Sequence, residues 1–340
     1  MVSRSPQHLT VGKMTPKVGV SDYVQPPFDL ELEALGESWE VVQIDSNLES
    51  FEGLSDLDAL LVWHAPITEE TVKLLRSCRI VVRYGVGYDQ INVPALENAG
   101  ILFSNTPDYG TEEVADTAAS MILHHVRRVG EYDYHCRHYA QGWQEHTLEP
   151  LMRTSTLCLG VIGVGRIGSA LIRRMRPFGF RIIGYDPYQP SGHEKAIGYE
   201  RVDAIADLLN QAHIVSMHCP ASEETTGMID ADFLAAMKEG SLLVNTARGS
   251  LIASLDPIYR ALRSGNLGAV ALDVLPSEPP EQHPLLDAWR AESPWLRGRL
   301  TITPHTAYYS ESAWKEMRFR AAQTIALFFE KGIYRNRVTS

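Results

Sequence analysis

Short apolar runs alternate with helix-period segments along the first third of this 340-residue chain. Such alternation predicts a parallel β-sheet with helices on both faces, in a first and smaller α/β domain. The strands are expected at 17–20, 40–43, 59–63, 80–83 and 101–104. The helices are expected at 30–35, 69–77 and 93–98.

The same alternation returns from residue 157 onward and predicts a second α/β domain. Its strands are expected at 157–162, 180–185, 214–217, 242–245, 269–273 and 300–302, and its helices at 167–175, 204–210, 231–237 and 257–263. Six strands is the number found in a complete dinucleotide-binding fold. The stretch 275–297, rich in Pro and Trp, is expected to be a long irregular loop with a functional role.

Two longer helical patterns connect these domains. Residues 111–139 are expected to form one linker helix, and 311–331 a last helix that returns to the first domain. The fold class is therefore α/β, with two doubly wound parallel-sheet domains: a Rossmann NAD-binding domain and a smaller, flavodoxin-like substrate domain. The expected boundaries are 1–17 for a loose tail, 18–110 plus 311–340 for the substrate domain, and 111–310 for the NAD-binding domain.

The glycine turn Gly163-Val-Gly165-Arg-Ile-Gly168 stands between a strand and a helix. Its first glycine permits the tight turn, its second lets the backbone approach a pyrophosphate, and its third lets helix pack on strand. The helix N-terminus adds free N–H groups for the phosphates. Asp186 lies 18 residues after Gly168, where a ribose-binding acid belongs. Its carboxylate would repel a 2′-phosphate, and Pro187 and Tyr188 offer no cation, so NAD is favoured over NADP.

Composition narrows the function further. The net charge of −11 and pI near 5.6 argue against direct binding of nucleic acid or an anionic membrane. The four cysteines have no CxxC spacing, and the histidines of 111–139 lack the partners of a metal site, so no metal is expected. There is no apolar run of roughly 18 residues and no signal-peptide pattern at the start of the chain, so we expect a cytoplasmic protein.

Chemically useful side chains follow the strands of the second domain, at the sheet edge where ligands bind. Arg248 can hold a carboxylate or carbonyl oxygen bidentately. His305 can donate and recover a proton, and Glu278 can hold the other ring nitrogen and fix the tautomer. An arginine, a histidine and a carboxylate are what the reduction of a 2-oxoacid requires. Each residue also has a non-catalytic interpretation: Arg248 as part of a surface ion pair, Glu278 as a solvated loop acid, and His305 as a cap or core group.

The first domain contributes two weaker signals. The turn Arg83-Tyr-Gly-Val-Gly87 follows a strand, and its backbone N–H groups either form an anion cradle or simply make a tight turn. His64 ends an apolar strand. It is more often a satisfied histidine near the core than a residue that faces a site.

Together these motifs resemble the D-isomer-specific 2-hydroxyacid dehydrogenases. The resemblance is carried by Asn245-Thr-Ala-Arg248-Gly249, by Ala271-Leu-Asp273-Val with Glu278-Pro279, by Thr303-Pro-His305 and by the glycine turn. It implies that Arg248 binds substrate, that His305 is the acid and base with Glu278 as its partner, and that the Val86 and Gly87 amides bind the substrate carboxylate. It also implies a homodimer.

The glycine turn and the resemblance together predict an NAD site. Its expected residues are Gly163, Gly165, Arg166, Ile167, Gly168, Asp186, His218, Cys219, Pro220, Thr225, Thr246, Ala247, Arg248, Asp273, His305, Val86 and Thr111.

Within the family, residues 82–87 and 303–311 look most like the C-terminal binding protein branch. That similarity implies that Arg83 and Tyr308 face the substrate. Tyr84 and His64 are further candidate substrate contacts, from their positions in the sequence. Two arginines around a small site predict a compact anionic substrate: a 2-oxo or 2-hydroxy acid, a phosphonate, or an aldehyde hydrate. Because that branch includes transcriptional corepressors, the alternative is a non-catalytic NAD(H)-sensing interaction protein.

Overall fold

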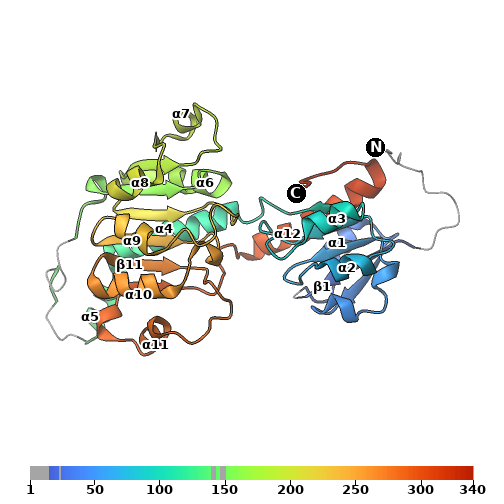
Figure 1. Cartoon of the computed structure of the whole chain (residues 1–340), viewed down its shortest axis with the longest axis horizontal. Coiled ribbons are helices and arrows are strands. Elements are labelled where there is room, and N and C mark those ends of the chain that lie inside the picture. The colour runs from blue at the N-terminus through green and yellow to red at the C-terminus, as the bar shows by residue number, and fades with distance from the viewer. Residues whose placement is uncertain (1–14, 23, 139–142, 146–150, 340) are drawn as a thin grey trace. The chain divides into compact units, whose positions relative to one another are not determined.

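The computed structural model describes residues 15–22, 24–138, 143–145 and 151–339. The chain divides into two compact units, each with its own parallel sheet (Figure 1). Unit 1 comprises Met1–Gly110 and Ser310–Ser340, and unit 2 comprises Thr111–Tyr309. Most of the expected tail, residues 1–14, lies outside the described residues, and Lys17 already belongs to the first strand.

Unit 1 is a five-stranded parallel sheet of order β2-β1-β3-β4-β5, which is the flavodoxin-like order. The strands are β1 (Lys17–Ser21), β2 (Glu40–Ile44), β3 (Ala59–Val62), β4 (Ile80–Arg83) and β5 (Leu102–Ser104). The helices are α1 (Asp29–Leu35), α2 (Glu69–Leu74), α3 (Val93–Asn98) and α12 (Glu311–Lys331). The central strand β3 is buried along its whole length, as expected of a sheet covered on both faces.

The C-terminal helix α12 completes unit 1 by packing on α1. Ser310 caps its N-terminus, since the hydroxyl accepts a hydrogen bond from Ala313 N at 2.9 Å. Arg318 on this helix forms a buried ion pair with Glu31 on α1, at 2.6 Å between Nη2 and Oε2. These contacts explain how a segment distant in sequence joins the first sheet.

Unit 2 is a seven-stranded parallel sheet of order β12-β11-β10-β9-β6-β7-β8. Read from β8 to β11, this is the dinucleotide-binding order, with β12 added beyond β11. The strands are β6 (Cys158–Ile162), β7 (Arg181–Tyr185), β8 (Glu200–Arg201), β9 (Ile214–Met217), β10 (Ser241–Asn245), β11 (Leu267–Leu272) and β12 (Leu300–Ile302). The helices are α4 (Thr111–Arg127), α5 (Val129–His138), α6 (Arg166–Met175), α7 (His193–Ile197), α8 (Ile205–Gln211), α9 (Ala231–Ala236), α10 (Leu255–Ser264) and α11 (Pro284–Arg290).

The structure confirms the α/β fold class and corrects three details. The short strand β8 and helix α7 were not expected. The expected loop 275–297 contains α11, which begins with a proline after His283, whose ring Nδ1 accepts from Leu285 N at 3.1 Å. Apart from the linker helix, the remaining expected elements agree with the structure to within about three residues at their ends.

The single linker helix expected at 111–139 is wrong, because the structure has two helices, α4 and α5. Arg128 between them has φ 49°, a left-handed conformation that ends α4. Its guanidinium donates to both carboxylate oxygens of Glu131, at 2.7 and 2.8 Å, which holds the bend. Gly130, two residues after this bend, is the one helix-weakening residue near it in the sequence, and the prediction of a single helix passed over it. Tyr139 lies outside the described residues.

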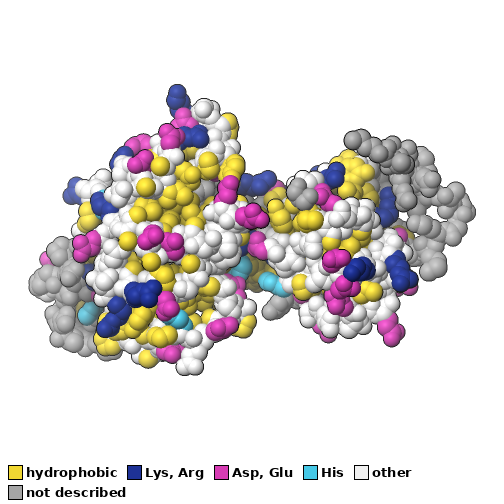
Figure 2. Space-filling view, in the orientation of Figure 1, with side chains coloured by type: hydrophobic (Ala, Val, Ile, Leu, Met, Phe, Trp, Pro, Cys, Tyr) yellow, Lys and Arg dark blue, Asp and Glu magenta, His cyan; other side chains and the backbone are white. Residues whose placement is uncertain are grey.

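The surface of both units mixes charges of both signs. On the face shown in Figure 2, Lys and Arg side chains do not gather into one patch, and acidic side chains lie among them. In the described part of the chain, no helix combines the length and apolar character needed to cross a membrane.

Candidate active site

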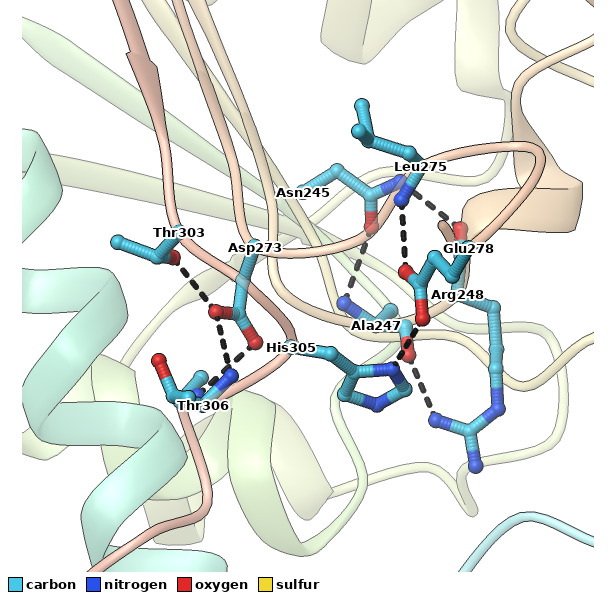
Figure 3. A network of polar contacts seen from close by, with 10 residues as sticks. Asn245, Ala247, Arg248, Asp273, Leu275, Glu278, Thr303, His305 and Thr306 are labelled. Carbon is cyan, nitrogen blue, oxygen red and sulfur yellow. Dashed lines mark hydrogen bonds and ion pairs between the residues drawn. The ribbon is translucent and has the colours of Figure 1, made fainter. Parts of the chain in front are cut away.

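Loops that follow three neighbouring strands of unit 2 meet at the carboxyl-terminal edge of its sheet (Figure 3). The buried carboxylate of Asp273, directly after β11, organises them. Its Oδ1 accepts from Thr303 Oγ1 at 2.6 Å and from Thr306 N at 2.9 Å, and its Oδ2 accepts from Ala307 N at 2.9 Å. Three hydrogen bonds to one buried charge fix the segment that carries His305.

His305 lies in the middle of that segment with φ 54°, an uncommon conformation for a residue other than glycine. Its backbone N–H donates to the Asp273 carbonyl at 2.8 Å. Its ring is partly exposed, and Nδ1 lies 2.7 Å from Oε2 of Glu278. The left-handed backbone is thus held by its neighbours and directs the imidazole toward the loop after β11.

Glu278 is fixed from two sides, because its other oxygen, Oε1, accepts from Leu275 N at 2.9 Å. Burial by itself would raise the pKa of this carboxyl. The hydrogen bonds from His305 and Leu275, together with the positive charges of His305 and Arg248, outweigh burial and lower the pKa below 4.5. An ionised Glu278 accepts a hydrogen bond from the N–H group at Nδ1 of His305. The other ring nitrogen, Nε2, is therefore the one left for the substrate.

Arg248 follows β10 and is held by the strand before it. The side chain of Asn245 accepts from Ala247 N at 3.0 Å and donates to the Arg248 carbonyl at 2.9 Å. A Cβ on Gly249 would lie 1.8 Å from the Leu275 carbonyl oxygen, so the two loops approach as closely as only glycine permits. This approach brings Arg248 near Glu278 (Figure 3).

The glycine turn before α6 has the geometry of a phosphate site. Gly163 has φ +88°, and a Cβ there would lie 2.5 Å from Cys219 N. A Cβ on Gly168 would lie 2.1 Å from the Gly163 carbonyl oxygen, whereas one on Gly165 would meet nothing within 4 Å. The turn is therefore packed on two sides and open at Gly165, in front of the α6 N-terminus, where backbone N–H groups attract anions.

Among the buried polar atoms without a hydrogen-bond partner in the described residues are three in unit 2: Thr111 Oγ1, His218 Nδ1 and Thr246 Oγ1. All three belong to residues expected to contact the cofactor. The Nε2 of His218 lies 2.8 Å from Ser216 Oγ, and burial lowers the His218 pKa to about 4, so this ring is neutral at pH 7. Buried polar atoms are normally satisfied, and a polar ligand such as NAD would satisfy these. The residues fit the cofactor.

Two comparisons decide the family. The family model described as "D-isomer specific 2-hydroxyacid dehydrogenase, NAD binding domain" matches residues 119–307. A glyoxylate reductase of Korarchaeum cryptofilum is 34% identical over 331 residues, which cover 95% of this chain and 92% of that protein. The chain belongs to the D-isomer-specific 2-hydroxyacid dehydrogenase family. It is an NAD-dependent oxidoreductase, as the strand-end residues and the glycine turn of the sequence predict.

Other relatives agree. A D-3-phosphoglycerate dehydrogenase of Methanocaldococcus jannaschii is 33% identical over 312 residues, covering 88% of this chain and 55% of that protein. The structure is similar to that of D-lactate dehydrogenase from Aquifex aeolicus, complexed with NAD and lactic acid, with 25% identity, TM-score 0.81 and coverage of 95% and 99%. It is also similar to an NADPH-dependent glyoxylate/hydroxypyruvate reductase from Sinorhizobium meliloti, with 25% identity, TM-score 0.81 and coverage of 96% and 97%.

Asp186, the expected ribose acid of this dehydrogenase, also has a structural task. Its Oδ2 accepts from Val164 N at 2.8 Å, inside the glycine turn, and its Oδ1 accepts from Tyr188 N at 3.0 Å. Arg201, which was not predicted to lie near Asp186, donates a hydrogen bond to the Asp186 carbonyl at 3.4 Å. A guanidinium group therefore lies beside Asp186, where the sequence indicated no cation.

The other expected cofactor residues lie around the same sheet edge. Burial raises the pKa of the Cys219 thiol to about 11, so this cysteine is no nucleophile. Thr225 Oγ1 donates to the Pro220 carbonyl at 2.7 Å and shapes the loop after β9. Arg166 is the exposed first residue of α6, and Ile167 and Ala247 are half-buried.

In unit 1, the turn after β4 is held through its carbonyl groups. The carbonyls of Gly85 and Val86 accept from Thr106 N at 3.0 Å and Asn105 Nδ2 at 2.7 Å. Within the described residues, no protein group accepts from the amides of Val86 and Gly87. The side chain of Arg83 folds over Gly85, where a Cβ would lie 2.2 Å from its Nη1.

The expectation that Tyr84 contacts substrate is wrong. Its side chain is fully buried, and its hydroxyl donates to Oε1 of Glu31 at 3.0 Å. Burial, and then the neighbouring carboxylate, raise its pKa well above 10.0. Alternation explains the error, because side chains of neighbouring residues in an extended chain point to opposite faces.

His64 departs from its default expectation, and Tyr308 lies beside His305. His64 is exposed and stacks on Trp63, with ring centroids 5.6 Å apart, so its default placement near the core is wrong. Tyr308 is half-buried, and its ring lies edge-on to that of His305, with centroids 6.4 Å apart. Tyr308 therefore lies beside His305, and substrate roles for His64 and Tyr308 stay predictions.

Sequence reasoning gave no role to the residues that support the site. These include Asn245, Thr303 and Ser216, which act through side-chain hydrogen bonds, and Gly249, which acts through having no side chain. Their positions at strand ends were a usable signal, but Thr303 and Gly249 act on the segment that follows another strand, at Asp273 and Leu275. Among the described residues, no group of three or more His, Cys, Asp or Glu side chains could hold a metal ion.

Proposed function

We propose that this protein interconverts a small 2-oxo acid and the matching 2-hydroxy acid, with glyoxylate as the type of substrate. One observation carries the proposal: His305 Nδ1 lies 2.7 Å from Glu278 Oε2, beside Arg248. An oriented imidazole next to a guanidinium suits proton transfer to a carbonyl whose acid group is held by a cation. The similarity to the Korarchaeum glyoxylate reductase over 95% of the chain supports the substrate class.

Hydride transfer is the chemistry that NAD supplies when it is bound. Arg248 holds the substrate carboxylate or carbonyl oxygen and withdraws electron density from it. His305 gives the proton on its Nε2 to the carbonyl oxygen during reduction, and takes it back during oxidation. Glu278 stabilises the protonated ring through Nδ1, so the proton that is transferred is on Nε2, the nitrogen that faces the substrate.

The sequence left open which small anion is the substrate. Arg83 and the amides of Val86 and Gly87 are proposed to bind its anionic end, and Tyr308 to limit its size. A phosphonate, a dicarboxylate or an aldehyde hydrate would suit the same groups. The non-catalytic sensor remains the weaker alternative, because the named relatives are reductases and dehydrogenases.

The test is NADH oxidation, followed by absorbance at 340 nm, against a panel of 2-oxo acids, with NAD reduction on hydroxy acids, phosphonates and aldehydes in parallel. His305→Ala should lose turnover by at least about 10³-fold while NADH affinity stays within about twofold. Arg248→Lys should raise KM or lower kcat/KM by at least about 10²-fold, since an ammonium cannot form the fork. Arg260→Lys, at an exposed position on α10, is the matched control and should behave as wild type.

Three results would contradict the proposal. His305→Ala with wild-type turnover would remove this histidine from the mechanism. Normal activity of Arg248→Lys would remove the bidentate contact. Tight NADH binding without turnover of any compound on the panel would favour the NAD(H)-sensing alternative. The homodimer and the cytoplasmic location stay predictions; light scattering after gel filtration tests the first, and cell fractionation the second.

A further inference from the structure

A cavity of about 400 Å³ lies in unit 2 at the amino-terminal edge of its sheet. It is found where α8 and α9 end and lead into β9 and β10. The catalytic loops occupy the opposite, carboxyl-terminal edge. His213 and His218 flank the same strand, β9, so the two edges are roughly 16 Å apart at about 3.3 Å per residue. The cavity is lined in part by Ser155, Thr156, Arg181, Asn210, His213 and Lys238.

His213 is held in one orientation by the sheet. Its backbone N–H donates to the Cys158 carbonyl at 2.8 Å, and its carbonyl accepts from Leu242 N at 2.9 Å. The backbone N–H of Cys158 then donates to Nδ1 of the His213 ring at 3.0 Å. A nitrogen that accepts a hydrogen bond carries no proton, so the proton of the neutral ring must be on Nε2. Burial, and then the positive charge of Lys238, lower the pKa of His213, which keeps the ring neutral at pH 7.

The Nε2 of His213 lies 3.1 Å from Nζ of Lys238. An ammonium group has three donors and no acceptor, so two donors face each other across this distance. In the part of the chain that the structure describes, Lys238 has no carboxylate within ion-pair distance. Arg181, on the rim of the cavity, is by contrast already paired with Glu200, at 2.6 Å between Nη2 and Oε2. The positive charge available to a ligand is therefore that of Lys238.

We propose that this cavity binds a small tetrahedral oxyanion of the phosphate class, one oxygen of which accepts hydrogen bonds from both His213 Nε2 and Lys238 Nζ. A shared acceptor removes the conflict between the two donors and neutralises the ammonium charge. The Ser155 hydroxyl and the Asn210 amide line the same cavity and can donate to the remaining oxygens. The site is separate from the catalytic loops and does not depend on the proposed substrate.

The test is thermal unfolding with increasing inorganic phosphate, at constant pH and ionic strength, with chloride and acetate as comparison anions. Saturating NADH occupies the nucleotide site throughout. An anion that binds only the folded state raises Tm with its concentration. The wild-type Tm should rise with phosphate more than with chloride or acetate. Lys238→Gln should weaken the apparent phosphate affinity at least about tenfold, whereas Arg248→Gln, which alters the catalytic edge, and Lys195→Gln, at an exposed position on α7, should retain it.

Lys238→Gln also separates a binding role from a merely structural one. Because a glutamine oxygen can accept from His213 Nε2, the variant should be at least as stable as wild type in phosphate-free buffer. A variant that is less stable there, yet gains the same Tm increment from phosphate, would overturn the proposal. So would a wild-type Tm that responds equally to phosphate, acetate and chloride. Finally, ¹⁵N NMR should find the His213 proton on Nε2, and a proton on Nδ1 would contradict the argument.

Discussion

The Asp273→Asn substitution tests whether the buried carboxylate holds the catalytic segment in place. The change keeps the shape of the side chain but replaces one acceptor oxygen by a donor NH₂ group. In the orientation that retains the hydrogen bonds from Thr303 Oγ1 and Thr306 N, the new NH₂ group faces Ala307 N. In the flipped orientation it faces the other two donors. Asparagine can therefore keep at most two of the three hydrogen bonds.

The expected loss of stability follows from those bonds. A hydrogen bond to a charged group contributes about 1.5–3 kcal/mol and a neutral one about 0.5–1.5, so each retained bond loses roughly 1 kcal/mol. Two buried donors that face each other cost about 1–3 kcal/mol more. Removal of a buried charge offsets part of this total, which leaves a loss of about 3 kcal/mol in the free energy of unfolding. For a unit of this size, that loss lowers Tm by about 6–12 °C.

The activity of Asp273→Asn should fall as well, because His305 is carried by the loosened segment and its backbone N–H donates to the Asp273 carbonyl. A displacement of about 1 Å at a catalytic group can cost about 10²-fold in rate. We therefore expect kcat/KM to fall at least about tenfold at a temperature where the variant is folded. Calorimetry and steady-state kinetics on the same preparation measure both effects.

Two variants of Thr303 serve as matched controls. Thr303→Val removes one donor to the carboxylate and should cost about 1.5 kcal/mol, whereas Thr303→Ser keeps the hydroxyl and should stay near wild type. If Asp273→Asn melts within about 1 °C of wild type and keeps normal kinetics, the carboxylate does not organise this segment.

Three further predictions concern the cofactor and Glu278. Gly165→Ala should leave the Tm of the free protein unchanged, because a Cβ there meets nothing within 4 Å. The same change should weaken NADH binding at least about tenfold in fluorescence titrations. Unchanged affinity would remove Gly165 from the phosphate site. Asp186→Ala should lower the ratio of kcat/KM for NAD over NADP, and an unaltered ratio would exclude the ribose contact. Because the pKa of Glu278 is lowered from 4.5 in the folded protein, its stabilising contribution is complete above that pH and is lost as the pH falls through the folded value. In pH-dependent denaturation, the stability difference between wild type and Glu278→Gln should therefore shrink below about pH 4.5, and a constant difference down to about pH 3 would contradict this.

The sequence by itself determined the fold class and most of the elements, and it named candidate site residues. Apolar runs at strand length and glycines at fixed spacing are local properties, so the two α/β domains and the glycine turn of residues 163–168 followed directly. The motif residues Arg248, Glu278 and His305 were named because parallel strands place their carboxyl ends on one edge. Patterns of this kind depend only on residues that are close in the chain, so they can be read before the fold is known.

Only the tertiary structure decided which groups actually meet. The Tyr84 hydroxyl meets Glu31, which lies 53 residues earlier, and the left-handed Arg128 at the bend is held by a side-chain bond to Glu131. The converging donors of His213 and Lys238 require three strands to be adjacent, with the backbone N–H of Cys158 fixing the tautomer. Hydrogen-bond partners, burial and tautomers are set by distances between residues far apart in the chain, and no pattern along the sequence encodes those distances.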